Sequence, residues 1–173
     1  EGRVIGCGEA HRVAVLVPLY NEDPDVVVRM LSALLHQSAP PAEIHVVDDG
    51  STQGAYAEER DWFIRQAALA GIYASWQRTP NEGKRHAQVH GFRKIRDADL
   101  FVTVDSDSML DAEALHEIVQ PFSDPRVMSV AGVILAINNR ENLLARVTDV
   151  IFVGQQLIDR SFMSQLEIGR AHV

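Results

Sequence analysis

Cysteine is almost absent from this chain, which has one, Cys7, among its 173 residues. A single thiol cannot form a disulfide within the chain, and zinc sites built from four thiolates are excluded as well. Positive charge is also scarce, because 16 Lys and Arg stand against 24 Asp and Glu, which gives a formal net charge of -8. Nucleic-acid binding depends on cations that neutralise phosphates, so this balance argues against a nucleic-acid partner.

Long hydrophobic runs are missing too. No apolar stretch of the sequence approaches the roughly 20 residues that a membrane-spanning helix needs, and the N-terminus has no signal-peptide core. We therefore expect the chain as given to be soluble and its thiol to be reduced. Hydrophobic residues make up 46% and charged residues 23%, which is typical of a globular protein. The length suits one domain or a large part of one.

The chain alternates apolar runs with amphipathic segments after an aperiodic lead-in over residues 1–12. The segments expected as strands are 13–17, 44–47, 72–76, 100–104 and 128–137. The segments expected as helices are 24–39, 54–70, 81–95, a stretch capped by Asp111 and carrying Leu115, Ile118 and Val119, and 140–163. Strand–helix alternation with short connections predicts an α/β fold, with a mostly parallel sheet and helices on both faces.

Two of the expected helices and the first expected strand carry more detailed expectations. Asp23 followed by Pro24 is typical of a helix start, with Asp as the N-cap and Pro in the first position. Pro18 is expected to stop the first strand. The side chains expected to face the core from the helix 81–95 are Ala87, Phe92 and Ile95.

Polar residues gather where three of the expected strands end. These segments are Pro18–Glu22, Asp48–Ser51 and Asp105–Asp107. Ligands of open parallel sheets bind at the carboxyl ends of the strands. The three segments are therefore expected to converge on one crevice.

Asp105 and Asp107 are candidate metal ligands. They lie two residues apart at a strand end, so both carboxylates can point to the same side. Two such charges about 4 Å apart repel by roughly 4 kcal/mol at an effective dielectric constant of about 20, so a shared proton or a bound cation must offset them. Oxygen ligands favour Mg2+ or Mn2+ over Zn2+. The alternative is a solvated acidic turn before the next helix.

Three further positions have both a structural and a functional interpretation. The segment Asp48-Asp49-Gly50-Ser51 is either a turn or a source of carboxylates for a base or a ribose. Tyr20 is either a wall residue or a surface on which a base stacks. Lys84 opens a helix where the helix dipole disfavours a cation, which favours a phosphate contact there, although the segment is not a Walker A loop.

Four motifs together carry a resemblance to a known family. They are Val-Pro-Leu-Tyr-Asn-Glu at 17–22, Val-Asp-Asp-Gly-Ser at 47–51, Gly-Lys-Arg at 83–85 and Asp-Ser-Asp at 105–107. In this order and spacing the chain, over about residues 12–166, resembles the inverting family 2 glycosyltransferases of GT-A (Rossmann-like) fold. Its similarity is greatest to their processive membrane branch, which includes hyaluronan, chitin, NodC-type chitooligosaccharide and cellulose synthases.

The resemblance implies a role for each matching residue. The residues implied in nucleotide-sugar binding are Pro18, Tyr20, Glu22, Asp48, Asp49, Lys84 and Asp105. Among them Tyr20 and Glu22 would border the base and ribose, Asp48 or Asp49 would bond the uracil edge, and Lys84 would contact the diphosphate. Asp107, with Asp105, would hold the Mg2+ or Mn2+ that stabilises the departing UDP.

The chain also departs from the family's pattern. It has neither the later acidic motif that supplies the general base nor the Gln-x-x-Arg-Trp motif of processive members. We interpret residues 13–166 as the N-terminal, donor-binding part of a GT-A domain, incomplete at its C-terminus and with no general base of its own. Residues 167–173 match one reading frame of a common sequencing adapter, and we interpret them as a non-native tail.

These expectations lead to a main functional hypothesis. The parent protein would lie in the cell membrane with this domain on its cytoplasmic face and would transfer sugar from a UDP-sugar to a glycan or lipid-linked acceptor. One alternative is a nucleotide-binding module without turnover. Another is a sugar-phosphate nucleotidyltransferase, but that class expects a Gly-rich loop where this chain has Leu19-Tyr20-Asn21-Glu22.

Overall fold

The computed structural model of the protein describes residues 11–52 and 56–132. The expectations for 1–10, 140–163 and 167–173, and for the second half of the strand expected over 128–137, lie outside the described residues. The chain divides into two compact units, Glu1–Gln120 and Pro121–Val173. The predicted domain boundaries stay a prediction.

The first unit is built on a four-stranded sheet in the order β3-β2-β1-β4. The strands are β1 (Val13–Leu19), β2 (Glu43–Asp48), β3 (Tyr73–Arg78) and β4 (Leu100–Thr103). All three pairings are parallel, with Leu19 opposite Asp48 and Asp48 opposite Arg78 at the carboxyl ends. Every residue of β1 and β2 is buried, as expected for the central strands of a parallel sheet.

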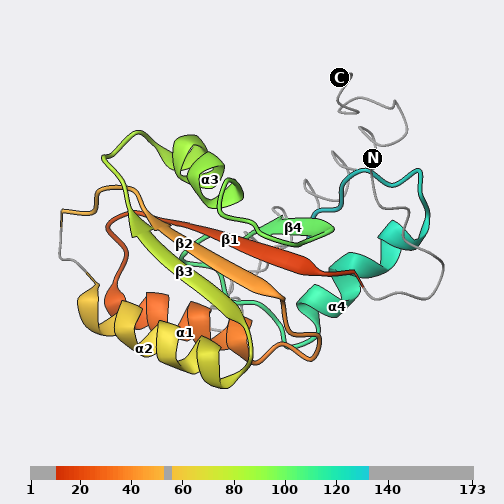
Figure 1. Ribbon diagram of the computed structural model, residues 1–173, viewed down its shortest axis with the longest axis horizontal. Coiled ribbons are helices and arrows are strands. Elements are labelled where there is room, and N and C mark those ends of the chain that lie inside the picture. Colours follow the sequence, from red (N-terminus) through yellow and green to blue (C-terminus); the bar gives the residue numbers. More distant parts are fainter. Residues whose placement is uncertain (1–10, 53–55, 133–173) are drawn as a thin grey trace, which may run out of the picture. The chain divides into compact units, whose positions relative to one another are not determined.

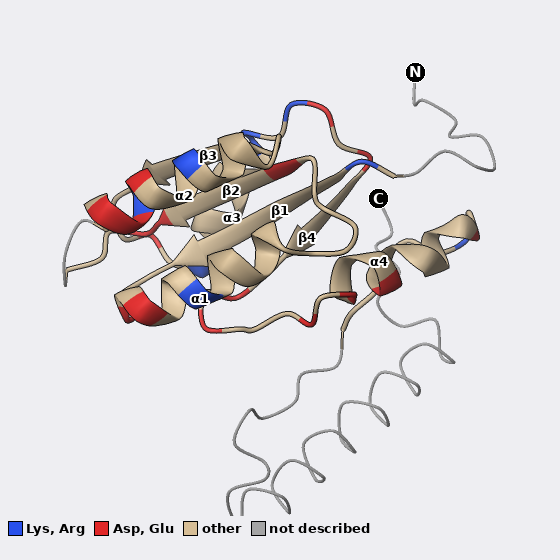
Figure 2. Ribbon diagram, turned by 90° about the horizontal axis from the view of Figure 1, so that it is seen from below, with Lys and Arg blue, Asp and Glu red and all other residues tan. Residues whose placement is uncertain are grey.

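Helices cover both faces of this sheet, which confirms the predicted fold class. The helices are α1 (Pro24–Leu35), α2 (Ala57–Leu69), α3 (Lys84–Phe92) and α4 (Ala114–Val119). Helices α1 and α2 lie side by side on one face and α3 lies on the other (Figures 1 and 2). A 3-10 turn, Gln120–Ser123, follows α4.

The start of α1 confirms the predicted cap. The Asp23 side chain accepts a hydrogen bond from the Asp25 amide at 2.8 Å, and Pro24 takes the first helical position. The apolar face that this helix buries against the sheet consists of Val27, Met30, Leu31 and Leu34. Side chains at spacings of three and four share one face of a helix, which explains why this set was predictable.

Pro18 does not stop β1, contrary to expectation, because the missing N–H costs no ladder bond. The carbonyl of Leu16 accepts from Val104 on the β4 side, and that of Leu19 accepts from Asp49 on the β2 side. Pro18 therefore faces the β4 side, where the paired register has already ended at Leu16 and Thr103. The strand continues to Leu19.

The helix expected over 81–95 is shorter than predicted, because Gly83 has a φ of +94° before it and 3-10-type bonds follow it. Ala87 and Gly91 face the sheet, and a Cβ on Gly91 would stand 3.3 Å from Leu16 Cδ2. The expectation that Phe92 is a core residue is wrong. Phe92 is 52% exposed and packs edge-on against Phe101, with 5.2 Å between ring centroids.

The expected cap of α4 is also displaced. Glu113 is the N-cap, and the Asp111 carboxylate accepts a hydrogen bond from the Glu113 amide, two residues further along the chain, at 3.0 Å. The buried Gln37 side chain satisfies the first turn instead, by accepting from Leu115 N at 2.9 Å. Within the described part of the expected strand 128–137, residues 128–132 form no strand.

Candidate functional site

The carboxyl ends of the strands open into a pocket of about 310 Å3. Its walls come from the segments after β1, β2 and β4 and from the start of α3. The lining residues are Pro18, Leu19, Tyr20, Glu22, Asp49, Asn81, Gly83, Lys84, Asp105, Ser106 and Asp107. Three strand-end segments that are far apart in the sequence thus meet at one place, as the polar clusters predicted.

Hydrogen bonds connect the segment after β1 to the segment after β2. The Asn21 amide donates to Ser51 Oγ at 2.9 Å, and Asn21 Oδ1 accepts from the Thr52 amide at 2.7 Å. Asn21 has a φ of 51°, a left-handed conformation that Asn tolerates better than most residues. These two bonds fix the backbone that places Tyr20 and Glu22 at the pocket.

Tyr56 supports the same loop from the start of α2. Its hydroxyl donates to the Glu22 carbonyl at 2.6 Å, and the side chain is 6% exposed. Burial raises the pKa of the Tyr56 hydroxyl, so it stays a neutral donor at neutral pH. Glu22 thus has its backbone held by Tyr56 while its side chain faces the pocket, 3.5 Å from Ser106 Oγ.

Asp49 lines the pocket and also builds it. Its two carboxylate oxygens accept from the Glu82 amide at 3.0 Å and from the Gly83 amide at 2.8 Å, and the residue is 4% exposed. These bonds hold the loop before α3 against the sheet. Gly50 allows the approach, because a Cβ there would stand 2.7 Å from the Asn81 backbone N.

Asp48 lies outside the pocket lining. It is fully buried, accepts from the Ser51 amide at 2.9 Å, and has Arg78 Nε 3.6 Å from its Oδ2. Arg78 also donates to the Ser51 carbonyl. Of the two adjacent carboxylates that the sequence left open as base-binding candidates, the pocket geometry thus brings only Asp49 to its surface.

Lys84 and Asp105 face each other across the pocket. Lys84 Nζ lies 2.6 Å from Asp105 Oδ1, with both side chains about half exposed. An ammonium therefore offsets the charge of one carboxylate in the pair Asp105–Asp107. Among the residues that the structure describes, no three or more His, Cys, Asp and Glu side chains are arranged to hold a metal ion.

Residues 14–170 match the Glycosyl transferase family 2 domain. The chain belongs to this family. Two curated relatives share most of the chain: a hyaluronan synthase from Streptococcus pyogenes, 35% identical over 155 residues, and an N-acetylglucosaminyltransferase from Bradyrhizobium diazoefficiens, 33% identical over 145 residues. They cover 89% and 80% of this chain, which in turn spans 37% and 28% of their lengths. The predicted resemblance is confirmed.

A solved structure confirms the GT-A fold for this family 2 chain. It is a mannosyltransferase from Pyrobaculum calidifontis in complex with GDP-Man and Mn2+, with a TM-score of 0.57 and 27% identity. The likeness covers 69% of this chain and 34% of that protein. In the part of the chain that the structure describes, no helix is long and apolar enough to cross a membrane.

Sequence reasoning on this family 2 domain found the residues with strong chemistry and missed those that hold them. The residues to which sequence reasoning assigned no role of their own, although several belong to the motifs, are Asn21, Gly50, Ser51, Tyr56, Asn81, Gly83 and Ser106. A turn-forming Asn-Glu-Gly before a helix was visible in the sequence. The contact of this turn with Asp49 could not be predicted, because the two segments are more than 30 residues apart.

Proposed function

We propose that this chain is the nucleotide-sugar-binding part of an inverting, metal-dependent glycosyltransferase that uses a UDP-sugar. The observation that carries the proposal is the pocket itself, which gathers an exposed aromatic ring, a lysine at a helix start and two neighbouring strand-end carboxylates. Family membership supports sugar transfer as the chemistry. UDP as the nucleotide rests on the resemblance to the hyaluronan synthase branch.

The two ends of the pocket suit the two ends of a nucleoside diphosphate. Tyr20 is 46% exposed on the wall and offers its ring for stacking on the base. Asp49 offers its remaining lone pairs to the base edge, since an ionised carboxylate has about four acceptor sites and two are used by backbone amides. Lys84, the first residue of α3, is placed to receive the diphosphate at the positive end of the helix dipole.

Asp105 and Asp107 fit a divalent cation of the Mg2+ or Mn2+ kind. Both carboxylates line the same pocket, and Asp105 already attracts a cationic group there. Mg2+ is commonly held by one or two carboxylates together with substrate phosphates, which suits a site with two carboxylates. When bound, such an ion would neutralise charge on the departing diphosphate.

We infer that the acceptor side of the reaction belongs to other parts of the longer protein. The matched stretch is about a third of the Streptococcus pyogenes relative, which leaves room for a general base and a membrane anchor elsewhere. The acceptor would be a growing glycan or a lipid-linked sugar, and the domain would lie on the cytoplasmic face of the cell membrane. Fractionation of the full-length protein tests the membrane location.

Calorimetry with UDP and Mn2+ tests the donor site. We expect the wild-type chain to bind UDP weakly in the presence of Mn2+ and the Asp107→Ala variant to lose most of that heat, because one of two carboxylate ligands is gone. Asp61→Ala is the matched control, since it removes an exposed carboxylate on α2 that pairs with the neighbouring Arg60. Equal heats from wild type and Asp107→Ala would contradict the proposed metal site, and absence of heat from the wild type would contradict nucleotide binding.

A further inference from the structure

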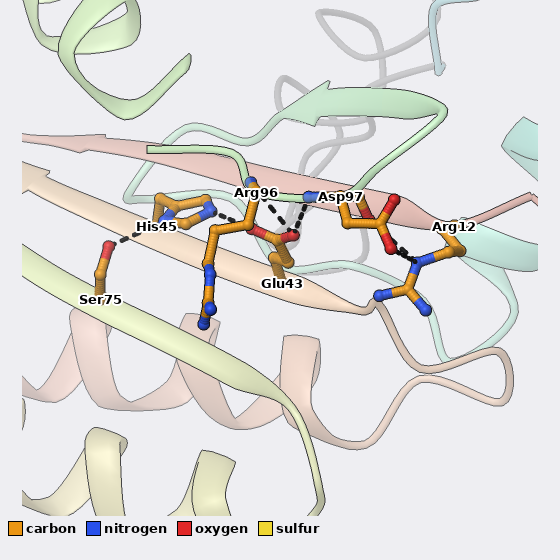
Figure 3. Close-up of polar contacts among 6 residues, drawn as sticks. All are labelled: Arg12, Glu43, His45, Ser75, Arg96 and Asp97. Carbon is orange, nitrogen blue, oxygen red and sulfur yellow. Dashed lines mark hydrogen bonds and ion pairs between the residues drawn. The ribbon is translucent and has the colours of Figure 1, made fainter. Parts of the chain in front are cut away.

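A buried polar cluster lies at the opposite end of the sheet from the pocket. Glu43 is 2% exposed and His45 is fully buried, although both belong to the central strand β2. His45 Nε2 lies 2.9 Å from Glu43 Oε2, and His45 Nδ1 lies 2.8 Å from Ser75 Oγ on β3 (Figure 3). A charged residue is rarely buried in a strand unless hydrogen bonds compensate for the lost water.

The compensation for Glu43 comes from the segment that connects α3 to β4. Its carboxylate accepts from the Asp97 amide at 2.8 Å and from the Arg96 amide at 3.0 Å (Figure 3). Burial alone would raise the pKa of Glu43, but these amides and His45 outweigh it and hold the pKa below its ordinary value. An ionised Glu43 can only accept, so His45 donates to it from Nε2. Burial lowers the pKa of His45 and favours the neutral ring, whose Nδ1 then accepts a hydrogen bond from the Ser75 hydroxyl.

The connecting segment is also held from the solvent side. Arg12 Nε donates to the Asp97 carbonyl at 2.9 Å, and the Arg12 amide donates to Asp99 Oδ2 at 2.9 Å. The Arg96 guanidinium lies 4.5 Å from the centre of the Tyr73 ring on β3. The two amide bonds to Glu43 are part-buried, so the loss of this acceptor would leave the Arg96 and Asp97 amides without their protein partner.

Helix α3 is therefore fixed at both of its ends by carboxylates of the β2 region. Asp49 holds the Glu82 and Gly83 amides before the helix, and Glu43 holds the Arg96 and Asp97 amides after it. The connection that Glu43 anchors joins the helix that begins with Lys84 to the strand that leads to Asp105. Glu43 itself is not among the pocket-lining residues.

We propose that Glu43 is a positioning residue for the Lys84–Asp105 pair. By fixing the α3–β4 connection at the far end of the sheet, it sets where both partners stand in the pocket. The inference rests on the proposed function only for its effect on nucleotide binding. Its structural part is tested without any ligand.

Amide hydrogen exchange of the ligand-free chain tests the structural part. In Glu43→Gln the side chain keeps one acceptor oxygen and presents an NH2 group to the backbone donors, so at least one bond is lost. We expect exchange at least about tenfold faster over 84–92 and 100–103 as well as at Arg96 and Asp97, with α1 unchanged. Glu58→Gln, an exposed change of the same kind on α2, should match the wild type.

Two results would overturn the inference. One is faster exchange confined to the connection 93–99, because α3 and β4 would then hold their places without Glu43. The other is an equal increase in α1, because the residue would then support the whole fold rather than the pair. If α3 and β4 form one local cooperative unit, their amides should become exchangeable together.

The wild-type chain supplies a test that does not depend on the variant folding. In native-state exchange at rising denaturant, the Arg96 and Asp97 amides should open in the same step as the amides of α3. Opening of those two amides in a separate, easier step contradicts the inference.

Calorimetry with UDP and Mn2+ then measures the functional part. We expect Glu43→Gln to bind about tenfold more weakly than Glu58→Gln. Unchanged affinity together with faster exchange over 84–92 would contradict the positioning role. If the wild type binds no UDP, the proposed function fails, and the exchange pattern still decides the structural part.

Discussion

At the scale of single residues, Gly50 shows how one backbone position shapes the pocket. It has a φ of +72°, and the loop before α3 passes so close that a Cβ would stand 2.7 Å from the Asn81 backbone N. Backbone atoms cannot yield as a flexible side chain can. The loop that carries Gly83 therefore lies against the sheet only because position 50 has no side chain.

Substitution of Gly50 separates this steric effect from backbone strain. We expect Gly50→Ala to lower the free energy of unfolding by about 3 kcal/mol. Gly71→Ala is the matched control, since Gly71 has the same φ of +72° and nothing within 4 Å of its Cβ position, and it should cost about 1 kcal/mol. Urea unfolding of both variants measures the difference. Equal losses would show that the contact with Asn81 relaxes freely.

Residue chemistry was the most predictable part of the candidate site. Tyr20, Lys84 and the carboxylates after β4 all line the pocket, because their place follows from the end of a strand or the start of a helix. The choice between Asp48 and Asp49 was not predictable. Their side chains point to opposite sides of an extended backbone, and only the sheet determines which side faces the pocket.

At the scale of elements, the cluster around Glu43 and His45 gives the fold a defined acid response. Burial lowers the pKa of His45 below its ordinary value of 6.5, against the opposing effect of Glu43. The pKa of Glu43 lies below its ordinary value of 4.5. A group with a depressed folded-state pKa stabilises the protein above its unfolded pKa, and that stabilisation is lost as the pH falls.

The free energy of unfolding should therefore decline in two stages on acidification. The first begins as the pH falls below about 6.5, where unfolded His45 takes up a proton, and the second begins below about 4.5, where unfolded Glu43 does so. Urea unfolding from pH 8 to about pH 3 measures both stages. In His45→Leu the first stage should shrink. An unchanged slope between pH 7 and pH 5 in this variant would contradict the assignment to His45.

Element order was predictable and element ends were less so. Apolar periodicity placed the four strands and the faces of α1, because burial of that periodicity is what drives their packing. The length of α3 depended on Gly83 and on Asp49, which is distant in the sequence. Gln37, which caps α4 from the segment after α1, and Pro18, which continues β1, follow from tertiary contacts that no local pattern contains.

At the scale of the whole molecule, the acidic side chains fall into a buried group and a group that lines the pocket. The formal net charge is -8. Three of the acidic side chains, Asp48, Asp49 and Glu43, are buried and accept hydrogen bonds from backbone amides. Those carboxylates organise the sheet and its loops. Others, at Asp105 and Asp107, line the pocket.

The ion pair between Lys84 and Asp105 makes the lysine an internal competitor for any cation that binds there. A diphosphate that draws Lys84 away would free Asp105, so nucleotide and ion should each raise the other's affinity by the same factor. We expect Mn2+ alone to bind at least about tenfold more weakly than Mn2+ with UDP, measured by electron paramagnetic resonance titration. Lys84→Gln should strengthen binding of Mn2+ alone, whereas Arg85→Gln should not. Such linkage would let the pocket retain its ion only while a donor nucleotide is present.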